Sequence, residues 1–190
     1  ALEKNPSKKP LANAQDHWGM EAVGFNWTEQ DSVDNRWNET EIGSFLASTI
    51  PLEGLSPIRK GLSVRVGEDD RGAVCYDTAT LQMRAAWQDG FLKFHPARFG
   101  LINSPAPAGQ MQWMVAEGPG WTGGALRYRG LQSRGRRVLL NYDVGTTSIR
   151  ESPWMEKISA GRVFQRTMEV GASNGELRLR LGPIQGETKT

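Results

Sequence analysis

The chain has 190 residues, of which 38% are hydrophobic and 23% charged, so the composition supports about one packed domain and excludes wholesale disorder. Lysine and arginine number 23 against 21 aspartates and glutamates, a balance that gives no reason to expect nucleic-acid binding. No apolar run reaches the roughly 18 residues that a membrane helix needs, and the single cysteine excludes an intrachain disulfide, a cysteine-rich zinc site and covalently attached haem c.

Residues 1–40 predict an extended, irregular arm. The first 15 residues have little to bury, and the following segment stays polar, with isolated aromatics and no sustained period of 2 or 3.6. The chain begins Ala1-Leu2-Glu3 without an initiator methionine, which fits either the end left by signal-peptide cleavage or a chain trimmed at that point. The best helical stretch, residues 39–47, has only a weak helical pattern.

From residue 42 onward, short apolar runs alternate with turns. Residues 62–66 alternate apolar and polar side chains and predict a half-buried strand, which the turn 67–72 joins to a return strand at 73–76. Further strands are predicted at 81–87 and 91–94. The closely spaced prolines and glycines at 104–109 and 118–124 predict loops.

The last third of the chain predicts hairpins. The turn 133–135 separates two apolar runs, and the second of them places Val138, Leu140, Tyr142 and Val144 on one face. Together the predicted strands of this part are 126–132, 136–144, 147–151, 162–170 and 176–181. We therefore predict an all-β antiparallel sandwich of roughly ten strands over residues 41–182, followed by a C-terminal tail at 183–190.

Charge is divided unevenly along the chain. Residues 1–80 hold 8 Lys and Arg against 13 Asp and Glu, whereas residues 126–190 hold 12 against 6. Five arginines lie close together in the basic part: Arg127, Arg129, Arg134, Arg136 and Arg137. Guanidinium groups bind carboxylates and phosphates in bidentate fashion, so this cluster is a candidate partner surface. A solvated strand face accounts for the same pattern, as does an acidic N-terminal arm lying across the arginines of its own molecule.

Tryptophan is used seven times, at Trp18, Trp27, Trp37, Trp87, Trp113, Trp121 and Trp154. Exposed indole rings stack on sugars, so a carbohydrate-binding module that binds polysaccharide through Trp113 or Trp121 is an alternative function. Tryptophan equally anchors loops and subunit interfaces. We therefore place Trp113 and Trp121 with the arginine cluster in the predicted partner or ligand surface.

Metal and haem ligands are sparse. His17 and His95 are the only histidines, and their spacing does not pair them, so we expect no shared metal site. His95 is a candidate residue for contacting, or axially ligating, a group that a neighbouring chain or domain supplies. Met111 and Met114 are alternatives for haem ligation, although methionine among β-strand aromatics usually fills core space.

Catalytic motifs are missing from the sequence. Cys75 lies in an apolar run and is predicted to be a small buried hydrophobe. Glu68, Asp69 and Asp70 sit in a predicted turn, where solvated charge or a loose calcium site are the two interpretations. No nucleophile elbow, phosphate loop or dinucleotide fingerprint is present, so we expect no self-contained active site and leave activity within a larger oxidoreductase open.

Three blocks of sequence carry a resemblance to a known family. They are RKGLSVRV at 59–66, AVCYDTATLQMRAAWQDGFL at 73–92 and YRGLQSRGRRVLLNYDVG at 128–145, with flanking matches at 43–46 and 164–167. In this order and spacing they resemble the uncharacterised N-terminal β-rich domain of large secreted bacterial proteins, many of which also carry c-type cytochrome domains.

The resemblance implies an exported protein, periplasmic or extracellular, in an electron-transfer assembly whose haem c belongs to other domains or chains. It supplies no catalytic residues, and the histidine-rich stretch of the family is reduced here to His95-Pro96. We therefore expect a non-catalytic structural or docking module, or a subunit, of an exported assembly that contains c-type cytochromes. We expect no cofactor in this chain itself.

Overall fold

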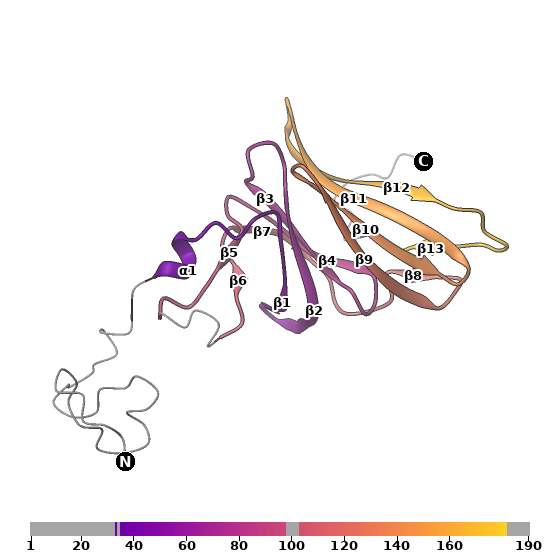
Figure 1. The fold of residues 1–190 in the computed structure, drawn as a ribbon, viewed down its shortest axis with the longest axis horizontal. Coiled ribbons are helices and arrows are strands. Elements are labelled where there is room, and N and C mark those ends of the chain that lie inside the picture. Colours follow the sequence, from indigo (N-terminus) through magenta and orange to yellow (C-terminus); the bar gives the residue numbers. More distant parts are fainter. Residues whose placement is uncertain (1–32, 34, 98–102, 182–190) are drawn as a thin grey trace, which may run out of the picture.

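The computed structural model describes residue 33 and residues 35–97 and 103–181, and it confirms the all-β prediction (Figure 1). One short helix, α1 (Arg36–Glu39), precedes the strands of this described part. No helix in the same residues is long and apolar enough to cross a membrane. The predicted tail at 183–190 and all but the last residues of the predicted arm lie outside the described residues.

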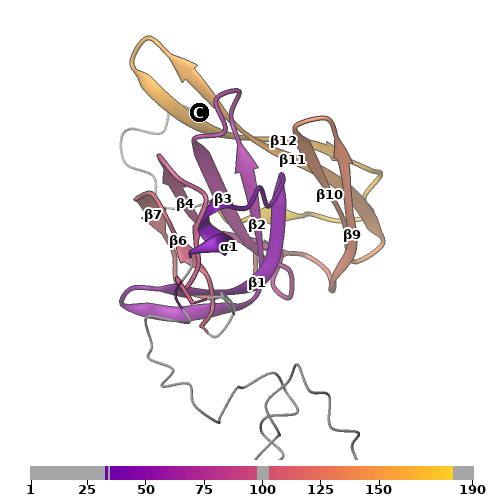
Figure 2. The same ribbon diagram turned by 60° about the vertical axis from the view of Figure 1, so that its left-hand side comes forward.

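Two antiparallel sheets form the body of the fold. The first sheet has the order β1-β2-β3-β4-β7, with β1 (Phe45–Leu52), β2 (Leu55–Val66), β3 (Gly72–Asp77), β4 (Gln82–Gln88) and β7 (Gln110–Met114). The second sheet has the order β12-β11-β10-β9, with β9 (Leu126–Arg134), β10 (Arg137–Val144), β11 (Thr147–Ile158) and β12 (Gly161–Val170). Figures 1 and 2 show the long strands of the second sheet beside the first.

Two short strand pairs complete the described fold. β5 (Leu92–Lys93) pairs with β6 (Ala106–Pro107), and β8 (Trp121–Thr122) pairs with β13 (Arg178–Leu179). The segments predicted as loops therefore contain β6 and β8, and the predicted strand at 176–181 is only two residues long. Pro107 is tolerated because β6 is a very short strand at the edge of its pair.

The main core lies between the two sheets because alternate residues of each strand face it. Strand β10 is regular in this respect: Val138, Leu140, Tyr142 and Val144 are buried, as predicted, while the residues between them are more exposed. The facing side of the first sheet contributes buried residues of β2, β3 and β4, among them Leu62, Val64, Val66, Val74, Tyr76, Met83 and Ala86. The arrangement is the predicted sandwich.

A second core covers the other face of the first sheet. All six residues of β3 are buried, including Cys75, and Trp87 of β4 donates its indole N–H to the carbonyl oxygen of Phe91 at 2.6 Å. The prediction of a half-buried strand at 62–66 is wrong for this reason, since Ser63, between Leu62 and Val64, is fully buried as well. The cover comes from the chain around β5, through Phe91, Leu92 and Phe94.

The predicted helix at 39–47 is also wrong. Helix α1 ends at Glu39, and β1 begins at Phe45. Between them, Gly43 adopts a φ of +85°, a left-handed conformation that ends any helical path and that glycine enters without steric cost. Strand β1 then pairs with β2 along the edge of the first sheet, so long-range pairing decides the local structure.

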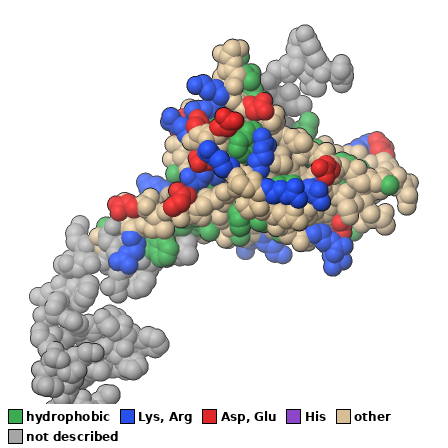
Figure 3. Space-filling model, turned by 45° about the horizontal axis from the view of Figure 1, so that its top comes forward, with side chains coloured by type: hydrophobic (Ala, Val, Ile, Leu, Met, Phe, Trp, Pro, Cys, Tyr) green, Lys and Arg blue, Asp and Glu red, His purple; other side chains and the backbone are tan. Residues whose placement is uncertain are grey.

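Ion pairs join the turns at one end of the sandwich. Arg162 of β12 contacts Asp69 at 3.2 Å and Asp89 at 3.1 Å, and Arg136 contacts Asp70 at 2.8 Å. These contacts link turns of the acidic first half of the chain to arginines of the basic second half. The turn carboxylates of Asp69 and Asp70 thus have arginine partners, and basic and acidic side chains lie interspersed where this end of the molecule is turned forward (Figure 3).

The second core predicts that replacing two isoleucines by alanine lowers the free energy of unfolding by very different amounts. Ile58 is fully buried there, whereas Ile158, at the end of β11, is 46% exposed. Ile58→Ala should lower the free energy of unfolding by about 2–5 kcal/mol, because it leaves a cavity. Ile158→Ala should change it by less than about 0.5 kcal/mol. Urea denaturation measures both, and similar losses would contradict the second core.

Candidate functional site

A buried carboxylate lies between the two sheets. Glu151 of β11 faces inward in step with Thr147 and Ile149, and its side chain is fully buried. It accepts hydrogen bonds from the hydroxyls of Tyr76 at 2.5 Å and Tyr142 at 2.6 Å. The guanidinium of Arg166 on β12 adds bonds from Nε at 2.5 Å and Nη2 at 3.0 Å. The carboxylate therefore has a charged partner and four donors, as a buried charge requires.

The two tyrosines of this centre keep their hydroxyl protons and donate them in hydrogen bonds to Glu151. Burial, together with the neighbouring Glu151 charge, raises the pKa of Tyr76 and of Tyr142 well above the ordinary tyrosine value. Burial disfavours the charged form of Arg166, but Tyr76 and Glu151 raise the pKa of Arg166 overall. Because Tyr76 belongs to the first sheet and the other members to the second, the centre joins the two sheets.

Trp121 belongs to the same centre. Its indole N–H donates to the Tyr142 hydroxyl at 3.1 Å, and its side chain is only 6% exposed. The prediction that Trp121 lies on a partner or sugar-binding surface is therefore wrong. Trp113 of β7 is partly buried and packs against the main core, on the other sheet from the arginine cluster.

The outer face of the second sheet carries exposed arginines. Register places Arg127 of β9 opposite Asp143 of β10 and Arg134 opposite Arg137, in positions that alternate with the buried residues of β10. Arg150 of β11 has the same outward orientation between buried Ile149 and Glu151. We call Arg127, Arg129, Arg134, Arg137 and Arg150 the arginine face.

A β-bulge in β9 brings Arg129 to Asp143. The register shifts between Tyr128 and Gly130, where Gly130 has a φ of +120° that favours glycine. Arg129 Nε then donates to Asp143 Oδ2 at 2.6 Å, and the Ser148 hydroxyl donates to Oδ1 at 3.0 Å. The bond from Arg129, helped by Ser148 and the nearby charge of Arg127, lowers the pKa of Asp143 below its usual value.

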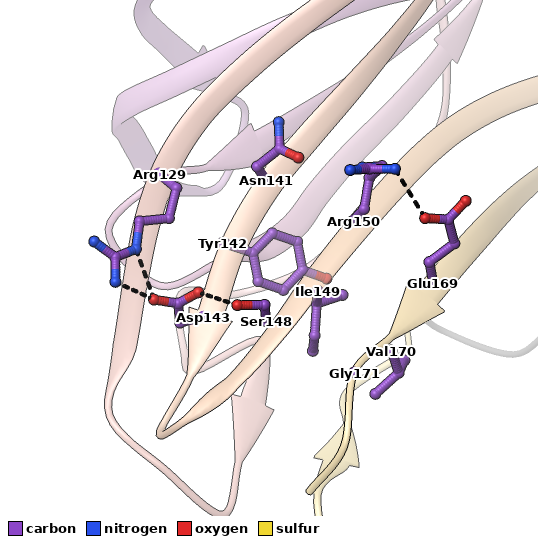
Figure 4. Close-up of a pocket in the computed structure, with 10 residues that line it drawn as sticks. All are labelled: Arg129, Asn141, Tyr142, Asp143, Ser148, Ile149, Arg150, Glu169, Val170 and Gly171. Atoms are coloured by element: carbon purple, nitrogen blue, oxygen red, sulfur yellow. Dashed lines mark hydrogen bonds and ion pairs between the residues drawn. The ribbon is translucent and has the colours of Figure 1, made fainter.

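An open cleft of about 570 Å³ lies on this face (Figure 4). Its polar lining includes Arg129, Asp143 and Ser148 at one side and the Arg150–Glu169 ion pair, 3.0 Å long, at the other. The cleft is thus bordered by two ion pairs, whose members come from all four strands of the sheet. Its chemistry suits carboxylate-bearing or other polar partners.

Two arginines on this face oppose each other directly. Arg134 and Arg137 are register partners, and like charges in that position destabilise a sheet. Arg137 gains compensation by stacking, since its guanidinium carbon lies 4.1 Å from the centre of the Trp154 ring. Arg134 has no ion pair with any described residue.

The structure thus gathers four of the five predicted arginines on one face. The fifth, Arg136, lies in the β9–β10 turn and pairs with Asp70. Sequence reasoning missed Arg150, Asp143, Ser148 and Glu169, which reach the cleft only through strand pairing. It also missed Glu151, although an acidic residue in step with Thr147 and Ile149 is a visible signal for a buried carboxylate.

The remaining predicted residues lie apart from this face. His95 is exposed after β5, where its Nδ1 accepts a hydrogen bond from the Ala97 amide at 3.2 Å. Met111 and Met114 pack against the second core. Within the described part of the chain, no group of three or more His, Cys, Asp or Glu side chains is placed to hold a metal ion. His17, Trp18 and Trp27 lie outside it.

The prediction for Cys75 is confirmed. The side chain is fully buried in the second core, and its thiol has no disulfide partner. Burial raises the pKa of the Cys75 thiol to about 12, so it remains protonated at neutral pH.

A comparison with known protein families gives a match. Residues 74–151 match a family described as a domain of unknown function (DUF6797). The match runs from β3 into β11 and includes Tyr76, Tyr142 and Glu151, but it ends before Arg166. Neither the curated proteins nor the solved structures provide a match.

The two faces of the β11–β12 pair predict losses of stability of very different size for two similar variants. Glu151 and Glu169 each bind an arginine on the neighbouring strand, but the Glu151 side chain is fully buried while that of Glu169 is 74% exposed. Glu151→Gln should lower the free energy of unfolding by about 3–5 kcal/mol, because it leaves the Arg166 charge buried without a counter-charge.

The matched control, Glu169→Gln, should cost less than about 1 kcal/mol, since an exposed ion pair contributes little. Chemical denaturation near neutral pH measures both variants. A loss for Glu151→Gln no larger than that for Glu169→Gln would contradict the assignment of a buried charged centre.

Proposed function

We propose that this chain is a non-catalytic docking module of an exported, c-type cytochrome-containing assembly, and that the arginine face binds an acidic surface of a partner chain or domain. The observation that carries the proposal is the concentration of exposed guanidinium groups on one sheet face. The arginine face has five arginines, while Asp143 and Glu169 are the carboxylates that pair with them among the described residues.

Arg134 and Arg137 lie directly opposite each other on neighbouring strands, and this supports a binding role. Two positive side chains in direct register reduce the stability of the isolated sheet, and a partner carboxylate placed between them would turn this repulsion into attraction. Such complementarity gives specificity and faster association to a docking interface.

The arginines of the two ion pairs on this face remain exposed, which supports the same role. The Arg129 and Arg150 side chains are 46% and 43% exposed in their pairs with Asp143 and Glu169. Because exposed pairs contribute about 0–1 kcal/mol, Arg150 can exchange Glu169, whose side chain is 74% exposed, for a partner carboxylate at low cost. Asp143 is only 13% exposed, so the Arg129 pair is expected to persist when a partner binds. The buried centre beneath joins β10, β11 and β12, and β9 pairs with β10 along its length, so the arginines are held on one sheet.

The cytochrome-containing assembly and the export are carried by sequence alone. Their support is the resemblance of the blocks at 59–66, 73–92 and 128–145 to domains of secreted proteins that also contain c-type cytochromes. In this proposal haem c belongs to partner domains or chains, and the present chain contributes the docking surface.

Carbohydrate binding receives less support from the structure. Of the two tryptophans that would stack on sugar, Trp121 is buried in the main core and Trp113 packs against it. Neither indole ring stands free on a sheet face, so we do not propose this function.

Isolation from the native source tests the proposal. The chain should co-purify with a protein that absorbs as haem c, and the complex should dissociate as ionic strength rises, because salt screens exposed charges over about 10 Å at 0.1 M. A chain that purifies alone, with no haem absorbance in any partner, would contradict the cytochrome-containing assembly.

Charge reversal then tests the surface. The double variant Arg127→Glu/Arg134→Glu should bind the co-purified partner about tenfold more weakly or worse, because two contacts become repulsive. The double variant Arg178→Glu/Arg180→Glu makes the same change in net charge at the exposed segment around β13 and should bind normally. Equal losses for the two, measured by titration calorimetry, would refute the arginine face as the interface.

A further inference from the structure

A groove of about 380 Å³ opens between the edges of the two sheets. On this side of the sandwich, β1 is the edge strand of the first sheet and β9 is the edge strand of the second, and residues of both line the groove. Edge strands keep unpaired backbone N–H and C=O groups, so an extended chain can bind along them.

The interior of the groove is largely apolar. Phe45, Leu62, Tyr128 and Leu131 line it, and all but Leu62 are only partly buried. Tyr128 is half-buried among these side chains, and this burial raises the pKa of its hydroxyl. The Ser48 Oγ atom is buried beside these side chains and has no hydrogen-bond partner. An occupant should therefore bring apolar side chains and polar backbone groups.

The rim of the groove is basic. Arg59 and Lys60 line it, and both are exposed. Neither makes an ion pair with a residue that the structure describes. Arg136 and Arg162, in contrast, pair with aspartates of the turns at one end of the sandwich. The groove thus combines an apolar interior with unpaired positive charge and fits an extended segment with aromatic and acidic side chains.

Residues 16–32 of this chain have that composition. They contain four acidic residues, Asp16, Glu21, Glu29 and Asp31, and no lysine or arginine. Phe25, Trp27 and Glu29 are spaced two apart, so in an extended strand they project from the same face. Two aromatic rings followed by a carboxylate match an apolar interior with a basic rim.

The segment also joins the described fold close to the groove. Val33 pairs with Ala97, and the Asn35 amide donates to the Pro96 carbonyl at 2.9 Å, just after β5. Strand β5 pairs with β6, which lies against β1. The chain therefore enters the described fold close to the edge strand that borders the groove.

We propose that residues 16–32 bind in the groove between β1 and β9 of their own molecule, with Phe25 and Trp27 on its apolar interior and Glu29 and Asp31 near Arg59 and Lys60. This inference is independent of the proposed function, because the groove and the arginine face involve different residues. It also differs from an arm that lies across the arginine cluster.

Site-specific photo-crosslinking in the full-length chain tests the proposal. A photoreactive phenylalanine analogue replaces Ala47, an exposed groove residue of β1, or Val163, an exposed residue of the opposite edge strand β12. The probe at 47 should crosslink to a peptide from residues 16–32 within a monomer, and the probe at 163 should not. Mass spectrometry of the digested monomer band identifies the peptide.

Charge exchange provides the decisive comparison. Arg59→Glu/Lys60→Glu should reduce the crosslink yield about fivefold to tenfold, since two attractive contacts become repulsive. Adding Glu29→Lys/Asp31→Lys should restore it, and circular dichroism checks that each variant is folded. No crosslink at 47, a crosslink only between two chains, equal yields at 47 and 163, or no rescue by the charge exchange would each overturn the proposal.

Discussion

The Glu151 carboxylate is the interaction on which the rest of the structure depends. A buried charge is costly unless donors surround it, and here Arg166 and two tyrosines supply them from both sheets. Tyr76 is the only one of these donors that comes from the first sheet, so its hydroxyl fixes how the sheets face each other. Hydrophobic packing alone tolerates small shifts, whereas a four-donor carboxylate requires one relative position of β3, β10, β11 and β12.

This constraint also shapes the outer face. Strand alternation that directs Glu151 and Tyr142 inward necessarily directs Arg150 and Asp143 outward, so the buried centre and the arginine face are two consequences of one register. A slip of one residue in β11 would bury Arg150 and expose Glu151. The arginines are therefore presented at defined positions, which is what a docking surface needs. The ion pairs of Arg136 and Arg162 hold the turns at one end of the same sandwich.

Local alternation allowed much of the fold to be predicted. Strands such as β2, β3, β4, β9, β10 and β12 have clear apolar patterns next to strong turns, and the all-β sandwich followed from them. Strand β1 was mistaken for part of a helix and β7 was missed, because both are edge strands whose structure comes from pairing with distant residues. The four arginines that share a face were predictable from two neighbouring strands. The cleft was not, since Arg150 and Glu169 join it through β11 and β12, and the tryptophan positions gave no information about which rings the second sheet would bury.

A double-mutant cycle between the two sheets tests the central claim most directly. Tyr76→Phe removes one hydroxyl from the first sheet, Glu151→Gln removes the charge from the second, and urea denaturation of both single variants and the double variant gives their coupling free energy. The structure predicts a coupling of about 1–3 kcal/mol, because the bond joins a hydroxyl to a buried charged acceptor. Strictly additive losses would show that Tyr76 and Glu151 act independently, and they would contradict a carboxylate centre that holds the sheets together.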